Sequence, residues 1–173
     1  DEEQWDRIIA TTRELEFVRR AWEEPSDQPL RLGVDPAREG DDMSIIRPRR
    51  GLRLFRATKK AHCDGRELAG HVLTDVRRLR RSEHERPTVV VDVIGIGSSP
   101  QDFLKDERCI RLLPIKSGNS PSPSTEDDYV NLRAELHFGV QDWINAGGGW
   151  EPDALFEEDL QASRYFLDKA GRA

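Results

Sequence analysis

The stretch Leu30-Arg31-Leu32-Gly33-Val34-Asp35 decides the fold of this chain, because it is a β-rich apolar run that ends in a carboxylate. Thr88-Val89-Val90-Val91-Asp92 repeats the arrangement. A carboxylate that follows a buried strand lies at the rim of a sheet, and two of them on neighbouring strands converge there. Convergent carboxylates are the ligands that hold Mg²⁺ and similar cations. Asp35 and Asp92 are therefore predicted to be metal-binding catalytic residues for hydrolysis of a phosphodiester by a pair of metal ions. The alternative is that each aspartate caps the turn or helix that follows its strand.

The composition describes a highly charged chain with a modest core. It has 173 residues, 36% hydrophobic and 35% charged, with a net charge of −6, which suits one domain. No apolar stretch approaches the roughly 20 residues that span a membrane, and the charged start Asp1-Glu2-Glu3 is not a signal peptide. Cys63 and Cys109 lack partners at metal-ligand spacing, so we expect free thiols in an intracellular setting and no zinc site.

The pattern of apolar residues predicts a mixed α/β sheet flanked by helices on both faces. Residues 1–29 are expected to form an N-terminal helix, over 2–24, and a linker. Strands are expected over 30–35, 43–47, 52–58, 88–93, 109–115 and 165–167. Asp64 and Glu67 are predicted to open a helix as a capping box, and a short helix is expected over about 99–105. A long helix follows, with an apolar stripe of Leu132, Leu136, Val140 and Trp143, and it closes at the glycines 147–149.

Further polar residues are candidates for a supporting role around the metal. Asp41 and Asp42 close the turn after Asp35, where ordinary turn chemistry explains them equally well. Asn131 and Glu135 lie four residues apart and share one face of the long helix, for which a solvated surface is the alternative.

Basic residues are the candidates for DNA contact, although a solvated face accounts for many of them. Arg49 and Arg50 belong to an arginine-rich hairpin bounded by Pro48 and Gly51. Arg38 lies in the turn after Asp35, and Arg133 lies on the long helix. The polar segment 116–127 is predicted to be a mobile surface loop that could also hold DNA.

Three segments together resemble a known family. Leu-Gly-Val-Asp-Pro-Ala-Arg-Glu-Gly-Asp-Asp (32–42) is similar to the first strand and turn of the nuclease domain of large terminase subunits from tailed phages. Val-Val-Val-Asp-Val-Ile-Gly-Ile-Gly (89–97) is similar to the second catalytic strand of that family. Tyr-Val-Asn-Leu-Arg-Ala-Glu-Leu (129–136) resembles its Asn-x-Arg-Ala-Glu helix. The resemblance covers roughly residues 30–173 in order and spacing.

The resemblance implies an RNase H-like fold over 30–173 and an endonuclease that cuts concatemeric viral DNA during packaging, with low sequence specificity. It assigns Asp35 and Asp92 as ligands of two Mg²⁺ or Mn²⁺ ions. The family's third catalytic carboxylate lies on a later helix with no match in this chain, and Asp168 is a poor substitute because the resemblance places it in the strand before that helix. The implied partners are double-stranded DNA, a packaging ATPase domain, the small terminase subunit and the portal, in the host cell cytoplasm and without a membrane.

Three other interpretations remain open. An actin-like sugar or acetate kinase also begins with Gly-x-Asp on a first strand, but it needs a glycine-rich phosphate loop where this chain has Pro-Ala-Arg-Glu-Gly-Asp-Asp (36–42). Other RNase H-like enzymes, such as transposases and junction resolvases, share the carboxylate pair but not the Asn-x-Arg-Ala-Glu helix. A non-catalytic module that docks onto DNA or a portal is the third.

Overall fold

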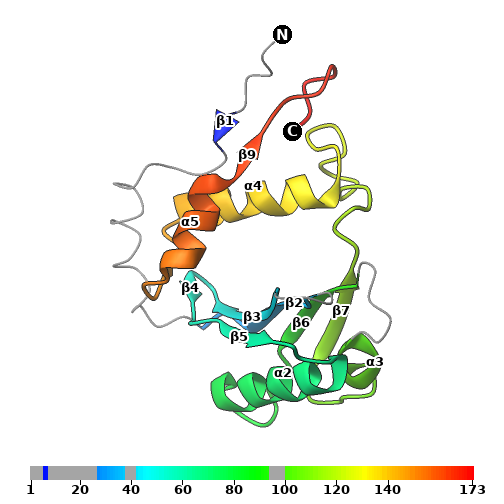
Figure 1. Ribbon diagram of the computed structural model, residues 1–173, viewed down its shortest axis with the longest axis vertical. Helices are drawn as coiled ribbons and strands as arrows, with labels where there is room; N and C mark the ends of the chain where they lie inside the picture. Colours follow the sequence, from blue (N-terminus) through cyan, green and yellow to red (C-terminus); the bar gives the residue numbers. More distant parts are fainter. Residues whose placement is uncertain (1–5, 8–26, 38–41, 94–99) are drawn as a thin grey trace. The chain divides into compact units, whose positions relative to one another are not determined.

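The computed structural model describes residues 6–7, 27–37, 42–93 and 100–173, which divide between two compact units (Figure 1). We call Pro25–Lys116 the sheet unit, and Ser117–Ala173 together with the N-terminal segment the helical unit. The helix predicted over 2–24 lies outside the described residues, apart from residues 6 and 7. Those two form a strand, β1 (Asp6–Arg7), instead of helix.

The sheet unit is built on a mixed sheet. Its central strands follow the order β7-β6-β2-β3, and both β4 and β5 pair with β3. The pairs β2–β6 and β6–β7 are parallel, and the pairs of β3 are antiparallel. The strands are β2 (Leu30–Asp35), β3 (Met43–Arg50), β4 (Arg53–Leu54), β5 (Thr58–Ala61), β6 (Thr88–Asp92) and β7 (Arg111–Ile115).

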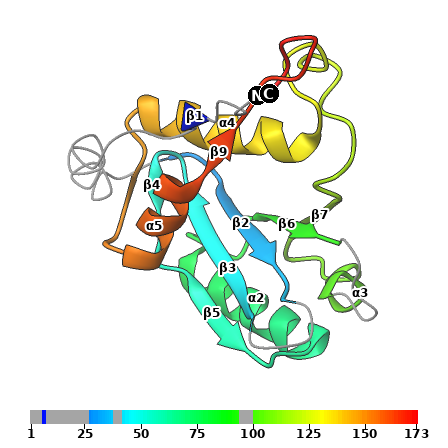
Figure 2. The ribbon, with the colours of Figure 1, turned by 45° about the horizontal axis from the view of Figure 1, so that its top comes forward.

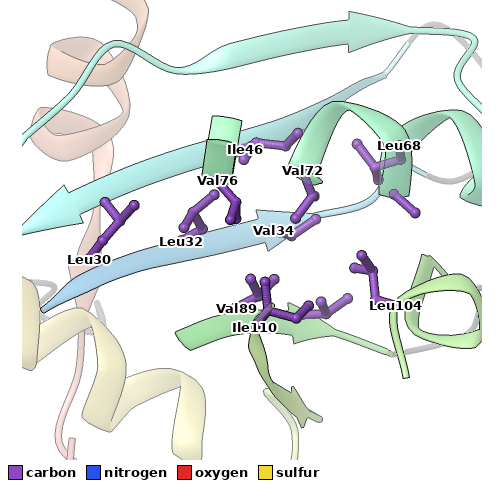
Figure 3. Close-up of a cluster of buried hydrophobic side chains, with 12 residues drawn as sticks. Leu30, Leu32, Val34, Ile46, Leu68, Val72, Val76, Val89, Leu104 and Ile110 are labelled. Atoms are coloured by element: carbon purple, nitrogen blue, oxygen red, sulfur yellow. The ribbon is translucent and has the colours of Figure 1, made fainter. Parts of the chain in front are cut away.

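One face of this sheet, which we call the core face, carries the hydrophobic core (Figure 3). Side chains alternate across a strand, so every second residue of β2, β3 and β6 points to this face. Helix α2 (Gly65–Leu79) covers it, and α3 (Pro100–Leu104) adds to the cluster (Figure 2). The buried residues are Leu30, Leu32, Val34, Ile46, Leu68, Ala69, Val72, Val76, Val89, Val91, Leu104 and Ile110.

The predicted capping box at the start of α2 is confirmed. The backbone N–H of Glu67 donates to Asp64 Oδ1 at 2.8 Å, and the backbone N–H of Asp64 donates to Glu67 Oε2 at 3.3 Å. These bonds satisfy two N–H groups that a helix start otherwise leaves without a partner. The helix therefore begins where its apolar residues can meet the core face.

The strands around Pro48 differ from the prediction. Pro48 was expected to end a strand, but β3 continues through it to Arg50, and Leu32 is its register partner. The carbonyl of Pro48 accepts a hydrogen bond from the Phe55 N–H at 2.9 Å. The nitrogen of Pro48 points to the same side as this carbonyl, between β4 and β5, so β2 loses no hydrogen bond from the missing N–H. The strand predicted over 52–58 is instead two short strands, β4 and β5.

The helical unit contains α4 (Leu132–Asn145), β8 (Gly149–Trp150), α5 (Ala154–Ala162) and β9 (Arg164–Tyr165), which pairs antiparallel with β1. Helix α4 ends as predicted, and Gly147 adopts φ 93° beyond its cap. The predicted apolar stripe is only partly right, because Leu136 is 45% exposed and Ile144 is the buried residue. Trp150 is fully buried, with its ring centroid 6.2 Å from that of Trp143.

Candidate active site

The last residues of β2 and β6 are Asp35 and Asp92, which we call the carboxylate pair. The two strands are parallel, and Val34 lies in register with Val91 immediately before them. Register neighbours on adjacent strands have Cα atoms about 5 Å apart. The sequence prediction that these strands are neighbours is therefore confirmed at the level of the sheet.

The carboxylate pair lies on the face of the sheet opposite α2, which we call the carboxylate face. In β2 the buried residues Leu32 and Val34 alternate with exposed Gly33 and Asp35. In β6 the same alternation buries Val91 and leaves Asp92 half-buried. Two like charges in register repel each other, and a cation placed between them removes that cost. The arrangement is therefore suited to a divalent ion.

Ser44 is a residue of this region that sequence reasoning missed. It is 1% exposed, and its Oγ accepts a hydrogen bond from the backbone N–H of Ala37 at 2.9 Å. That bond attaches the chain just beyond Asp35 to the neighbouring strand β3. A serine among β-branched residues gives no sequence signal of this role, because its partner is set by the register of β2 and β3.

Lys59 is a second residue that the sequence did not single out. Asp35 is in register with Ile45 of β3, and Ile45 with Lys59 of β5. Lys59 therefore occupies the same row of the sheet as Asp35, two strands away, at about 10 Å between Cα atoms. The row therefore runs from Lys59 of β5, past the carboxylate pair, to Ile115 of β7.

The donor set of the pair fits a hard divalent cation. Mg²⁺ is usually held by one or two carboxylates, with waters and substrate phosphates completing its shell, and Mn²⁺ accepts the same oxygen ligands. Within the described residues, no three side chains of His, Cys, Asp or Glu gather closely enough to form a metal site by themselves. Asp42 is described and exposed beside β3, whereas Asp41 and Arg38 lie outside the described residues.

Arg50 is corrected from a predicted DNA contact to a structural residue. Its side chain is 7% exposed and forms a two-pronged ion pair with Glu85, at 2.7 and 3.1 Å. It also donates to the carbonyls of Gln28 at 2.9 Å and Leu79 at 3.0 Å. The hydrogen bonds from Arg50 hold the pKa of Glu85 at about 2, well below its ordinary value. A guanidinium engaged in this way is not available to phosphate.

Arg49 lies on the carboxylate face, and its contact with DNA stays a prediction. It is half-buried and donates to the carbonyl of Gly51 at 3.2 Å. Burial, followed by the charge of Arg31, lowers the pKa of its guanidinium.

The helix-borne candidates are occupied within the helical unit. Asn131 is the N-cap of α4, and its Oδ1 accepts from the backbone N–H of Ala134 at 2.9 Å. Glu135 accepts from the hydroxyl and the backbone N–H of Ser122, both at 2.7 Å, and the pKa of Glu135 is lowered by these bonds. Arg133 donates to Ser117 Oγ at 3.2 Å. The segment 116–127 has no helix or strand, as predicted, yet these bonds attach it to α4.

Asp168 has partners of its own. Its carboxylate accepts from Arg172 Nη2 at 2.8 Å and from the backbone N–H groups of Ala170 and Arg172. The backbone hydrogen bond from Arg172, with its side-chain bond, lowers the pKa of Asp168.

In the same described residues, no helix combines the length and the apolar character needed to cross a bilayer.

Comparisons with known proteins give the fold. No protein-family model and no curated protein sequence matches the chain. The nuclease domain of the large terminase subunit gp2 of bacterial virus Sf6 is similar over 96% of this chain and 86% of that chain, with a TM-score of 0.78 and 14% identity. Mutant forms of the same domain with calcium and with manganese match over the same shares, with TM-scores of 0.77 and 0.75 and identities of 15% and 14%. This chain therefore has the RNase H-like fold of the phage terminase nuclease domain, as its sequence predicted.

Proposed function

We propose that this chain is a metal-dependent endodeoxyribonuclease domain of the terminase type, which cuts double-stranded viral DNA during genome packaging. The observation that carries the proposal is the register of β2 and β6, which brings Asp35 and Asp92 to one row of one face. The fold is that of domains whose solved structures are described as nucleases, some with manganese or calcium. The fold alone hosts many functions, so the carboxylate pair has to carry the argument.

In this proposal Asp35 and Asp92 hold Mg²⁺ or Mn²⁺ at the rim of the sheet. A bound ion supplies Lewis-acid activation of water and neutralises charge on the scissile phosphate. The two carboxylates would fix the position of the metal, since both belong to strands whose other face packs in the hydrophobic core. This chemistry needs no nucleophilic side chain, and arginines contact phosphates without reading bases, so sequence selectivity is low.

The further partners belong to the proposal as well. By likeness to the terminase fold, they are a packaging ATPase, a small terminase subunit and a portal, in the cytoplasm of the host cell. The supporting roles of Asp42, Asn131 and Glu135 around the metal, and of Arg133 at DNA, stay predictions. So do those of Asp41 and Arg38.

The first experiment measures nicking of supercoiled plasmid with Mn²⁺, Mg²⁺ or EDTA. We expect metal-dependent nicking by the wild type and a loss of at least about 100-fold in Asp35→Asn and in Asp92→Asn, since each change removes a charged ligand. Asp106→Asn is the matched control, because Asp106 is an exposed carboxylate of the sheet unit outside β2 and β6. It should nick like the wild type.

A second readout separates metal binding from turnover. Calcium or manganese should raise the melting temperature of the wild type and of Asp106→Asn, because a ligand that binds the folded state stabilises it. The shift should be absent from Asp35→Asn and Asp92→Asn. Equal nicking and equal melting shifts in all four proteins would place the metal, and the activity, away from the carboxylate pair.

A further inference from the structure

A row of arginines crosses the carboxylate face at the opposite end of the strands from the carboxylate pair. Arg31 of β2 is in register with Arg49 of β3 on one side and with Thr88 of β6 on the other, and Thr88 is in register with Arg111 of β7. We call Arg49, Arg31 and Arg111 the arginine row, with the hydroxyl of Thr88 inside it. Four strands at about 4.8 Å spacing make the row roughly 14 Å long.

Within the described residues, no carboxylate pairs with a member of the arginine row. Arg31 and Arg111 are exposed, and within the described part of the chain neither side chain forms an ion pair or a hydrogen bond. Arg49 bonds only a backbone carbonyl, that of Gly51, and its pKa is lowered by burial and by Arg31. Among the residues that the structure describes, no acidic side chain therefore relieves the repulsion within the row.

Like charges placed opposite each other on neighbouring strands destabilise a sheet. Three other arginines of the sheet unit are each paired with a carboxylate: Arg50 with Glu85, Arg78 with Asp75 and Arg81 with Asp27. Unpaired guanidinium groups in a line on one face have the geometry to contact several anions at once. Phosphates of a nucleic-acid strand are such a line of anions, and arginine donors match their oxygens.

The position of the arginine row relates it to the carboxylate pair. Arg31 and Asp35 lie four residues apart on β2 and on the same face, which is about 13 Å along the strand. Each DNA strand carries one phosphate per about 3.4 Å of helix axis, so this span corresponds to about four nucleotides. Thr88 and Asp92 repeat the spacing on β6.

We propose that the arginine row is a phosphate-binding subsite that holds the DNA backbone about four nucleotides from the scissile phosphate. The subsite rests on the proposed nuclease function and adds to it the track of the bound strand, which runs along β2 and β6 from the carboxylate pair to the row. Phosphate contacts of this kind position a duplex without selecting its sequence. The row thereby fixes which phosphate reaches the carboxylate pair.

The test compares two double variants that remove the same charge. Arg31→Gln with Arg111→Gln removes two members of the row, and Arg66→Gln with Arg77→Gln removes two exposed arginines of α2, which packs on the core face. Each is made in the Asp35→Asn background with EDTA present, so that DNA stays intact. Fluorescence anisotropy of a labelled duplex gives affinity from 50 to 200 mM salt, and plasmid nicking is measured with Asp35 restored.

We expect the row variant to lose about two units from the slope of log affinity against log salt, since each lost phosphate contact removes roughly one. The α2 variant should keep the wild-type slope. Equal slopes in the two variants, or no DNA binding by the parent protein, would overturn the subsite. Nicking tells the two proposals apart: a row variant with unchanged slope and a wild type that nicks would discard the subsite and keep the nuclease. A reduced salt slope in the row variant, together with no nicking by the wild type, would keep the subsite and discard the nuclease.

Discussion

The two faces of the sheet differ in chemistry although their residues alternate along the same strands. In β2, Leu30, Leu32 and Val34 are buried under α2, while Arg31, Gly33 and Asp35 occupy the carboxylate face. In β6 the valines 89 and 91 join the core, while Thr88 and Asp92 lie opposite. A period of two thus allows one strand to stabilise the fold with one set of residues and carry the site with the other.

Arg49 and Arg50 show the same difference in adjacent residues. Arg50 is turned to the core face, where a charge has to be paired, and Glu85 and two carbonyls surround it. Arg49 is turned to the carboxylate face and keeps donors available for an anion. The comparison teaches that the face of the sheet, more than the residue type, decides whether an arginine stabilises the protein or binds a ligand.

The largest expected effect on stability comes from Glu85→Gln. The change leaves the buried guanidinium of Arg50 without its counter-charge, which costs about 3–5 kcal/mol in the free energy of unfolding. All four tryptophans lie outside the sheet unit, so a probe inside the unit is preferred to their fluorescence. Hydrogen exchange of the β2 and β6 amides is the measurement. Asp27→Asn breaks the exposed pair with Arg81 and serves as control, with no measurable loss.

Leu32→Ala tests the core face directly. Leu32 is fully buried among α2 and the neighbouring strands, so truncation should cost about 2–5 kcal/mol through lost burial and the cavity left behind. Because the carboxylate face is unchanged, plasmid nicking by the fraction of protein that remains folded should keep its metal dependence. A loss of nicking far beyond the unfolded fraction would show that the two faces are not independent.

Acid should remove the contribution of Glu85 with a defined sign. Its pKa is held at about 2 by Arg50, below the ordinary 4.5, so the pair contributes stability that is complete above pH 4.5 and falls as the pH drops toward 2. The difference in unfolding free energy between wild type and Glu85→Gln should therefore shrink across this window. Exchange measured from pH 6 to pH 2.5 checks it, and a difference that stays constant would contradict the pairing.

The fold could be predicted from the sequence because its signals are local. Two strands ending in Asp and the Asp64–Glu67 capping box each determine an element within a few residues, and all of these are found. The register that aligns the carboxylate pair depends on pairing between distant segments, which the resemblance to terminase nucleases implied and local pattern did not.

The missed features depend on partners far away in the sequence. Pro48 is tolerated inside β3 only because its nitrogen faces the space between β4 and β5. Arg50 was grouped with Arg49 as a basic hairpin, since no local signal indicates that Glu85, 35 residues later, would reach it. The arginine row has the same origin, because its members belong to three strands and become neighbours only through the register.

Gly33→Ala has the smallest expected effect on stability and sharpens the comparison most. Gly33 lies on the carboxylate face between the arginine row and the carboxylate pair, and among the described residues an added Cβ would meet only the Arg47 carbonyl oxygen, at 4.0 Å. Alanine is favoured over glycine inside a strand by roughly 0.5–1 kcal/mol, so the sheet should become slightly more stable.

A glycine in a strand also permits close approach of another backbone, here the DNA strand between the arginine row and the carboxylate pair. We therefore expect weaker nicking at unchanged calcium binding. Gly70→Ala on α2 is the control, because a Cβ there meets no described atom within 4 Å, and it should stabilise the protein without affecting nicking. Unchanged nicking in Gly33→Ala would mean that DNA does not lie over this part of the carboxylate face.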